Sequence, residues 1–321
     1  NNNNNTDDMI ICFDAFKINS NNSYSENSEN SYKKNFEILF VFGKFNNRIL
    51  LQKIKVFTKS KSKKLNVENI FTKEIIISNL EEQNQLVNHV EFSKDKKFVY
   101  TCCNDSFIKI YDLSTFQEIN SFKTPNCANH LGYNSSSNII AVVGDYEEVI
   151  LLDPKSKEII NKLKGHYDFG FSAKFQKNSD FLLASSNQDQ SARIWDLRKI
   201  KDFEKEVYVN KFNKFDGNYF NFHENFIDKN TEGPLLKSYF GVCNAIGDLR
   251  FVQNDFLVLL ENTYNFHIVN MRDDKMQTIK YIGHCTGFDF HEGMEKLYFG
   301  LYQYDYAGIY AYKKIYIFFY F

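Results

Sequence analysis

Short apolar runs separated by polar turns recur along most of this chain. After residue 85 they group into units of three runs each, and most units start about 40 residues after the one before. Short runs of this kind, bounded by Asn, Asp and Ser, are typical of β-strands joined by tight turns. The pattern therefore predicts an all-β array of five units, at residues 87–113, 130–153, 169–197, 247–270 and 287–312.

The period of about 40 residues narrows this prediction to a β-propeller, in which each repeat forms one blade. Further apolar runs at 9–13, 36–42, 48–57 and 75–77 supply strands for one or two more blades, and 58–70 is expected to be a Lys/Ser-rich loop. Closing such sheets into a ring removes free sheet edges. We therefore expect a closed ring of seven blades over residues 36–314.

Three segments stand outside the repeats. Residues 1–35 are rich in Asn and Ser and are expected to be largely disordered, with one short strand. Residues 199–233 (Lys199–Gly233) break the period as an insertion, after which 235–240 is expected to resume as an outer strand. Insertions in repeat proteins often lie on a binding face, and an expansion without function is an equal alternative. Residues 315–321 are an apolar tail or the closing strand.

The unit at 169–197 carries the most specific signature. Gly165-His166 precedes it and Trp195-Asp196 closes it, with Ser185 and Asp189 between them. These offsets place Asp189 in a tight turn, with Ser185 and Trp195 on the strands around it. A carboxylate, an imidazole, a hydroxyl and an indole N–H can satisfy one another away from water. We therefore predict that His166, Ser185, Asp189 and Trp195 form a buried structural network.

The unit at 87–113 repeats part of this signature. Thr101, Asp105 and Tyr111 stand at the same offsets as Ser185, Asp189 and Trp195, and the histidine is lacking. Such repetition indicates a structural element of each blade, so we expect Thr101, Asp105 and Tyr111 to form a blade network of their own.

With Gly-His opening and Trp-Asp closing a unit of this length, the chain resembles the WD-repeat proteins. The stretches Gly165-His166-Tyr167-Asp168-Phe169, Asn187-Gln188-Asp189 and Gly287-Phe288-Asp289-Phe290 look like one poorly characterised WD-repeat family of fungi and plants. The chain departs from the usual pattern where Tyr111, Leu152 and Val269 stand in place of Trp. The resemblance implies a propeller that serves as a protein–protein interaction scaffold without catalytic activity.

Ser, His and Asp together also raise the alternative of a hydrolase. The Gly-x-Ser-x-Gly turn that exposes a nucleophilic serine does not accompany Ser185. We therefore favour the structural interpretation and expect no enzyme activity, although a polar pocket with perturbed carboxylates or histidines would support one.

One residue of the signature region is a candidate for partner binding. The stretch Trp195-Asp196-Leu197-Arg198 resembles the box of cullin-4 ubiquitin-ligase substrate receptors, which implies that an exposed Arg198 contacts an adaptor protein. Arginine is favoured at binding hot spots because its planar group donates several hydrogen bonds. The alternative function is therefore a substrate receptor of such a ligase.

Composition limits the remaining possibilities. The formal net charge is −1, so nucleic acid and membrane surfaces are not expected as partners. Six scattered cysteines without a Cys-x-x-Cys pair indicate reduced thiols in an intracellular protein, cytoplasmic, nuclear or both. The lysines from Lys53 to Lys64 suggest a solvated loop, with a nuclear address as the alternative. No His/Cys group has zinc-ligand spacing, so we expect neither metal nor cofactor.

Overall fold

The computed structural model describes most of the chain, which divides into two compact units, residues 1–128 and residues 129–321. Almost all regular structure in the described part is antiparallel β-strand. None of the described helices is long and apolar enough to cross a membrane. The described residues are 10–18, 32–44, 48–59, 64–76, 86–156, 158–202, 233–241, 244–262, 265–280, 284–291, 296–303 and 306–312.

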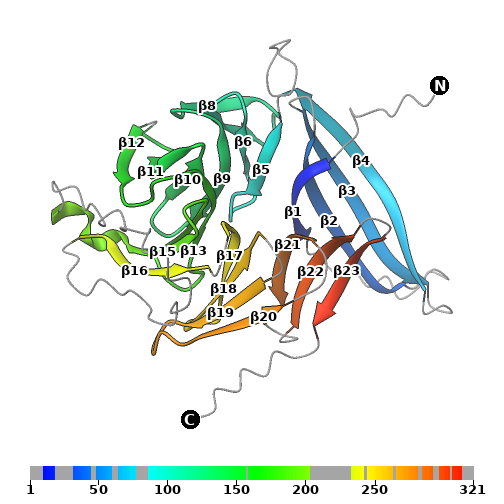
Figure 1. Cartoon of the computed structure of the whole chain (residues 1–321). Coiled ribbons are helices and arrows are strands. Elements are labelled where there is room, and N and C mark those ends of the chain that lie inside the picture. Colours follow the sequence, from blue (N-terminus) through cyan, green and yellow to red (C-terminus); the bar gives the residue numbers. More distant parts are fainter. Residues whose placement is uncertain are drawn as a thin grey trace, which may run out of the picture. The chain divides into compact units, whose positions relative to one another are not determined.

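The first unit contains two four-stranded sheets whose strands pair in chain order (Figure 1). The first sheet in chain order is called sheet I and the second is called sheet II. The strands of sheet I have 9 to 13 residues, whereas the strands of sheet II have six residues each. Sheet I consists of β1 (Ile10–Ile18), β2 (Tyr32–Lys44), β3 (Arg48–Lys59) and β4 (Leu65–Ile76), and sheet II of β5 (Val87–Phe92), β6 (Phe98–Cys103), β7 (Phe107–Asp112) and β8 (Glu118–Lys123).

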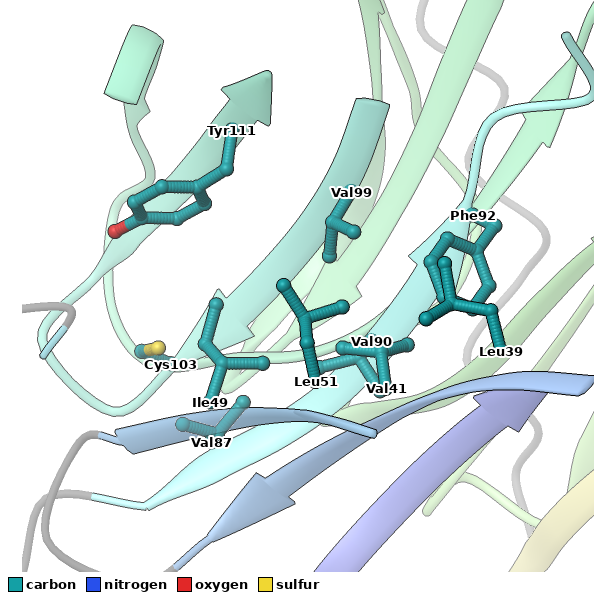
Figure 2. Packing of buried hydrophobic residues seen from close by; sticks show 10 residues of the cluster. All are labelled: Leu39, Val41, Ile49, Leu51, Val87, Val90, Phe92, Val99, Cys103 and Tyr111. Atoms are coloured by element: carbon teal, nitrogen blue, oxygen red, sulfur yellow. The ribbon is translucent and has the colours of Figure 1, made fainter. Parts of the chain in front are cut away.

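The core of the first unit lies between these two sheets. Alternate residues of β2 and β3 point to the same side, because successive side chains of a strand face opposite ways. Figure 2 shows these side chains directed at those of sheet II, so the two sheets are joined by an apolar layer. The layer consists of Leu39, Val41, Ile49 and Leu51 from sheet I and Val87, Val90, Phe92, Val99, Cys103 and Tyr111 from sheet II.

The second unit contains four antiparallel sheets. The first three have four strands and the last has three. Sheet III is β9 (Ala128–Asn134), β10 (Ile139–Gly144), β11 (Tyr146–Asp153) and β12 (Glu158–Leu163); sheet IV is β13 (Gly170–Phe175), β14 (Leu182–Asn187), β15 (Ser191–Asp196) and β16 (Leu235–Phe240); sheet V is β17 (Ile246–Val252), β18 (Phe256–Glu261), β19 (Asn265–Asn270) and β20 (Met276–Lys280); sheet VI is β21 (His284–His291), β22 (Lys296–Gln303) and β23 (Tyr306–Tyr312).

Sheets III to VI pack face to face in chain order. Leu183 of β14 joins Val143 in the core between sheets III and IV, whereas the next residue, Ala184, joins Leu257 in the core between sheets IV and V. Phe288 extends the series by joining the core of sheet V to sheet VI. The middle strands of sheets III to V are thus buried on both faces, which explains why they read as continuous apolar runs in the sequence.

The close spacing of the sheets is visible at Gly132 on β9. A Cβ added there would lie 2.5 Å from the backbone oxygen of Ala173 on β13. Only glycine allows two neighbouring strands from different sheets to approach to this distance.

The predicted repeats are confirmed strand by strand, but the blade count is not. Each of the five three-run units corresponds to three successive strands, and 235–240 is the outer strand β16. Within the described residues there are five four-stranded sheets and one three-stranded sheet, instead of seven blades. The sequence pattern missed the outer strands β8, β12 and β20 because they are largely exposed and carry few consecutive apolar residues.

The N-terminal boundaries differ from the prediction. Sheet I includes β1, where one short strand was expected within residues 1–35, and β2 begins at Tyr32, four residues before the expected strand at 36–42. The expected loop at 58–70 is wrong, since β4 starts at Leu65, and Lys53 lies on β3 in place of a solvated lysine-rich loop. An exposed edge strand lacks the apolar alternation by which strands are found.

Other sequence predictions fall outside the described residues. These are the proposed disorder of residues 1–9 and 19–31, most of the insertion (residues 203–232) and the apolar end at 313–321. The start of the insertion is described, and there Leu197–Asp202 forms a short 3₁₀ helix.

Candidate functional site

The predicted network of sheet IV is assembled from one loop, one turn and two strands. His166 lies in the loop before β13, Ser185 on β14, Asp189 in the β14–β15 turn and Trp195 on β15. The turn is tight enough to place Gln190 in the left-handed backbone region, at φ 68°. The four side chains that the sequence singled out therefore meet in one place.

Their hydrogen bonds run in one direction. The indole N–H of Trp195 donates to Ser185 Oγ at 2.8 Å, and Ser185 Oγ lies 2.7 Å from His166 Nε2. His166 Nδ1 lies 2.9 Å from Asp189 Oδ2. Because an indole only donates and a carboxylate only accepts, His166 carries its proton on Nδ1 and accepts the Ser185 hydroxyl proton on Nε2. The relay runs from Trp195 through Ser185 and His166 to Asp189.

Two further residues complete this network, and the sequence interpretation missed both. Ser191 Oγ donates to Asp189 Oδ1 at 2.6 Å and accepts from Arg193 Nε at 3.2 Å. The Arg193 side chain is fully buried, with Nη2 3.6 Å from Asp189 Oδ2. A signal was present in the sequence, since Arg193 stands four residues after Asp189 on a strand where a buried charge needs a partner.

Gly165 covers the guanidinium of Arg193. A Cβ at this position would lie 2.9 Å from Arg193 Nη1, and the backbone has φ of +150°, where side chains are strained. The glycine of the Gly-His pair is therefore required by both the backbone conformation and the space above the arginine.

Burial and the neighbouring charges set the ionisation of the network. Burial lowers the pKa of His166 and outweighs the opposing effect of Asp189, so the ring is held neutral. For Asp189, burial would raise the pKa, but His166, Arg193 and Ser191 together lower it to about 2. The site therefore holds one carboxylate, one guanidinium and a neutral imidazole.

Ser185, His166 and Asp189 have the connectivity of a hydrolase triad, but their setting opposes that chemistry. Ser185 is 0% exposed, so a substrate carbonyl has no path to its oxygen. Its oxygen also accepts the Trp195 N–H, which occupies a lone pair that a nucleophile would use. The geometry fits a relay that fixes the strands of sheet IV.

The corresponding residues of sheet II do not form the network that their spacing predicts. Asp105 pairs with Lys109 Nζ at 2.9 Å, and Thr101 Oγ1 donates to the Lys109 carbonyl at 3.4 Å. The Tyr111 hydroxyl is buried and has no hydrogen-bond partner among the described residues. Without a histidine, nothing links the strand hydroxyl to the turn carboxylate, and Tyr111 instead packs in the apolar core.

Sheet V contains a second buried network that the sequence interpretation did not identify. His267 Nε2 lies 2.9 Å from Glu261 Oε2, and its Nδ1 lies 2.9 Å from Thr278 Oγ1. Asn265 donates to the same Glu261 oxygen at 2.7 Å. Both His267 and Glu261 are 0% exposed. Here the acid is on β18 and the histidine on β19, so the spacing differs from that of sheet IV.

Arg198 lies at the surface, as predicted, and is held in one orientation. Its Nε and Nη2 donate to the two oxygens of Asp196 at 2.9 and 2.7 Å. The guanidinium carbon stacks 3.6 Å from the centre of the Phe181 ring. The side chain is nevertheless 61% exposed. Arg198 is thus a pre-oriented surface cation, whose remaining donors face solvent.

Polar side chains on the first strands of sheets III to VI contact one another from sheet to sheet. Ser172 Oγ donates to Asp248 Oδ1 at 2.8 Å, and Lys174 Nζ lies 3.0 Å from His130 Nε2. Arg250 Nε lies 3.5 Å from Asp289 Oδ1. Polar and charged side chains therefore link successive sheets of the second unit, in addition to the apolar cores.

In the described part of the chain, neither a metal-binding group nor a reactive thiol is assembled. No group of three or more His, Cys, Asp or Glu residues is positioned to hold a metal ion there. Cys102 and Cys103 are buried, and burial raises the pKa of Cys12 to about 12, which keeps that thiol protonated.

Four-stranded sheets stacked in series, with a Trp–Ser–His–Asp relay in one of them, define the class of WD-repeat propellers. The family model described as WD domain, G-beta repeat, matches residues 75–112 and 157–196, which include the Thr101–Tyr111 and His166–Trp195 regions. The chain therefore carries WD repeats in these two stretches. Its resemblance to one fungal and plant subfamily remains a prediction.

Relatives and solved structures agree with this assignment. The ribosome biogenesis protein YTM1 of Pyricularia oryzae is 28% identical over 107 residues, which is 32% of this chain and 22% of the relative. The histone acetyltransferase type B subunit 2 of Candida glabrata is 29% identical over 120 residues, 36% of this chain and 28% of the relative. These matches thus cover about a quarter of the relatives' length.

Among solved structures, one chain of a crystal structure of the mitotic checkpoint complex is similar, with a TM-score of 0.57 and 13% sequence identity. The similarity covers 85% of this chain and 75% of that one. At this identity it shows the propeller fold alone.

Proposed function

We propose that this chain is a non-catalytic protein–protein interaction scaffold that works inside the cell, in the cytoplasm, the nucleus or both. The observation that carries the proposal is the burial of the relay. Ser185, His166 and Asp189 are 0%, 4% and 7% exposed and bond to one another, so they rigidify a sheet in place of meeting a substrate. A rigid frame lets surface residues bind a partner with little loss of conformational entropy.

Arg198 is the surface residue best suited to such binding. Its stacking on Phe181 and its bidentate contact with Asp196 fix the guanidinium before a partner arrives. Arginine of this kind is enriched at interface hot spots. We propose that its free donors bind a carboxylate or backbone carbonyl of the partner.

Relatives suggest the kind of assembly. Because the YTM1 match is a ribosome biogenesis protein, we propose that the partners of this chain belong to a ribosome-assembly complex. Affinity purification from the native cell, followed by mass spectrometry, tests this. Ribosomal proteins and assembly factors should co-purify, and Arg198→Ala should reduce their recovery.

Arg272→Ala is the matched control for that experiment. Arg272 is also exposed and also paired with a carboxylate, Asp255, at 2.7 Å. Equal losses in both variants would show that charge alone, and not the Arg198 site, retains the partners. Recovery of no ribosome-assembly protein by the wild type would refute the assignment of the assembly.

A cullin-4 substrate receptor is the second candidate, favoured only by the exposure of Arg198 beside Trp195-Asp196. The relatives described above give it no support. The same purification distinguishes it, because a receptor must recover the ligase adaptor in an Arg198-dependent manner. A wild-type sample free of the adaptor eliminates this candidate.

A further inference from the structure

Strand β4 is an exposed edge of sheet I. It pairs with β3 on one side, and no described strand pairs with its other side (Figure 1). Ten of its twelve residues are exposed, including large apolar side chains. Leu65 is 59%, Val67 64% and Ile76 60% exposed. The strand thus presents a row of backbone donors and acceptors flanked by apolar groups.

Natural sheets avoid such an edge unless it has a partner. They use proline, short strands, bulges or a covering element to prevent pairing with another chain. β4 is 12 residues long and contains no proline; it carries a bulge at Ile70 and three charged residues, Glu68, Lys73 and Glu74. An edge of this length and apolar content is a template for strand addition.

The sequence of β4 is complementary to itself in one antiparallel register. We propose that β4 of one molecule pairs with β4 of a second copy, with Leu65 opposite Ile76 and Glu68 opposite Lys73. Asn69 then faces Thr72, and twofold symmetry makes every one of these pairs twice. Opposite charges and apolar residues placed directly across two strands stabilise their pairing.

This register is favoured over its neighbours by charge. A shift of one residue in one direction puts Glu68 opposite Glu74, and a shift in the other direction puts it opposite Thr72. Only the proposed register gives both copies a Glu68–Lys73 ion pair and keeps all twelve residues of β4 in the ladder. A strand from another protein is not expected to carry charges in this order, so a second copy is the favoured partner.

The bulge at Ile70 does not break the match. It lies between Asn69 and Phe71, which pair with Ile54 and Lys53 of β3. The faces therefore switch there: even-numbered positions lie on the core side before the bulge, and odd-numbered positions lie on it afterwards. Glu68 and Lys73 consequently point to the same side of sheet I. The Lys73 ammonium lies over the Phe116 ring at the margin of the core, which agrees with a position on the core side of sheet I.

The inference goes beyond the scaffold function and is tested on the full chain by sedimentation. The wild type should be a concentration-dependent dimer. Glu68→Lys or Lys73→Glu alone sets like charges across the dyad twice, and should weaken dimerisation about tenfold or more. Mixing the two single variants restores opposite charges in both pairs, so heterodimers should form at near wild-type strength.

Lys162→Glu is the matched control, because Lys162 is an exposed lysine on β12, the edge strand of sheet III. It should leave the dimer unchanged. A monomeric wild type at all concentrations overturns the proposal, as does failure of the mixed variants to associate. Circular dichroism on each variant shows that sheet content is retained.

A cross-link checks the register independently. In one chain, Leu65 and Ile76 stand eleven positions apart on an extended strand, about 36 Å. The Leu65→Cys/Ile76→Cys variant should therefore form a disulfide only between copies, giving a covalent dimer that Leu65→Cys alone does not give. A dimer that resists this cross-link pairs elsewhere, and the proposed register is then wrong.

Discussion

Each side chain of the relay of sheet IV has a defined donor or acceptor role. Trp195 donates to Ser185, Ser185 to His166, and His166 to Asp189, so each group satisfies the next. Such chains gain strength from mutual polarisation in a medium of low dielectric constant. Removal of an interior member therefore leaves two buried groups without a partner.

Ser185→Ala tests this at the level of one oxygen atom. The change removes the acceptor of the Trp195 N–H and the donor to His166, and should lower the free energy of unfolding by roughly 1–3 kcal/mol. Urea unfolding followed by circular dichroism measures it.

Ser186→Ala is the control for Ser185→Ala. The Ser186 hydroxyl is equally buried but has no hydrogen-bond partner among the described residues, so its loss should cost little. Equal destabilisation in the two serine variants would contradict the relay.

The relay also makes stability depend on pH. Burial lowers the pKa of His166 in the folded chain below the ordinary 6.5 of the unfolded chain. At a pH between the folded and the unfolded pKa, the unfolded chain therefore binds a proton that the folded chain does not. The contribution is fully present above pH 6.5 and is lost as the pH falls, by at most about 1.4 kcal/mol per pH unit. Asp189, with its pKa lowered to about 2, adds a further loss only below pH 3.8.

Unfolding of wild type and His166→Gln between pH 7 and pH 5 separates this effect from that of the other histidines. The wild type should lose stability more steeply than the variant as the pH falls. Parallel pH profiles would show that His166 is not the group responsible.

At the scale of the elements, equivalent strands use the same position differently. Trp195 on β15 donates its N–H to the relay, whereas Tyr111 on β7 buries a hydroxyl without a partner among the described residues. Burial raises the pKa of that hydroxyl, which stays protonated and only costs desolvation. In sheet II the hydrogen bond of the ring to the strand hydroxyl is therefore absent, whereas the packing of the ring in the apolar core is present.

Replacing each ring by phenylalanine distinguishes the two strands. Tyr111→Phe should be neutral or slightly stabilising, because it removes an unsatisfied polar group from an apolar core. Trp195→Phe should cost about 2–4 kcal/mol, because it removes a hydrogen bond and leaves a cavity. Thermal unfolding compares them, and a destabilising Tyr111→Phe would reveal a partner for that hydroxyl.

The elements also show what the sequence could foretell. The three inner strands of sheets II to V were predictable because most of their residues are buried. The Trp195 relay was predictable because a fixed spacing encodes it. The sequence indicated only the end of β4, at Ile75 and Ile76, and did not reveal β8, because the residues of both strands are mostly exposed and follow no apolar period. It also missed the Glu261–His267 pair, since residues six apart meet there only through the pairing of β18 with β19.

At the scale of the whole molecule, stability in the second unit is a sum of cores between successive sheets. Val143 and Leu183 belong to the core between sheets III and IV, whereas Ile268 belongs to the core between sheets V and VI. Neighbouring sheets should therefore be coupled, and sheets further apart should behave independently.

A double-mutant cycle measures this coupling. Val143→Ala combined with Leu183→Ala should deviate from additivity by 0.5–3 kcal/mol, because both variants enlarge one cavity. Val143→Ala combined with Ile268→Ala should be additive within about 0.5 kcal/mol. Strong coupling in the second pair would show that the sheets transmit strain beyond their neighbours.

The relay has one more consequence, which is optical. Trp195 is the single tryptophan of the chain, and it is fully buried with its ring 6.0 Å from that of His166. Tryptophan fluorescence of the entire protein therefore reports on sheet IV and on the core that it shares with sheet III. A ligand, a variant or a change of pH that disturbs this sheet will alter the emission spectrum. Structural changes confined to sheets I and II will leave the emission spectrum unchanged.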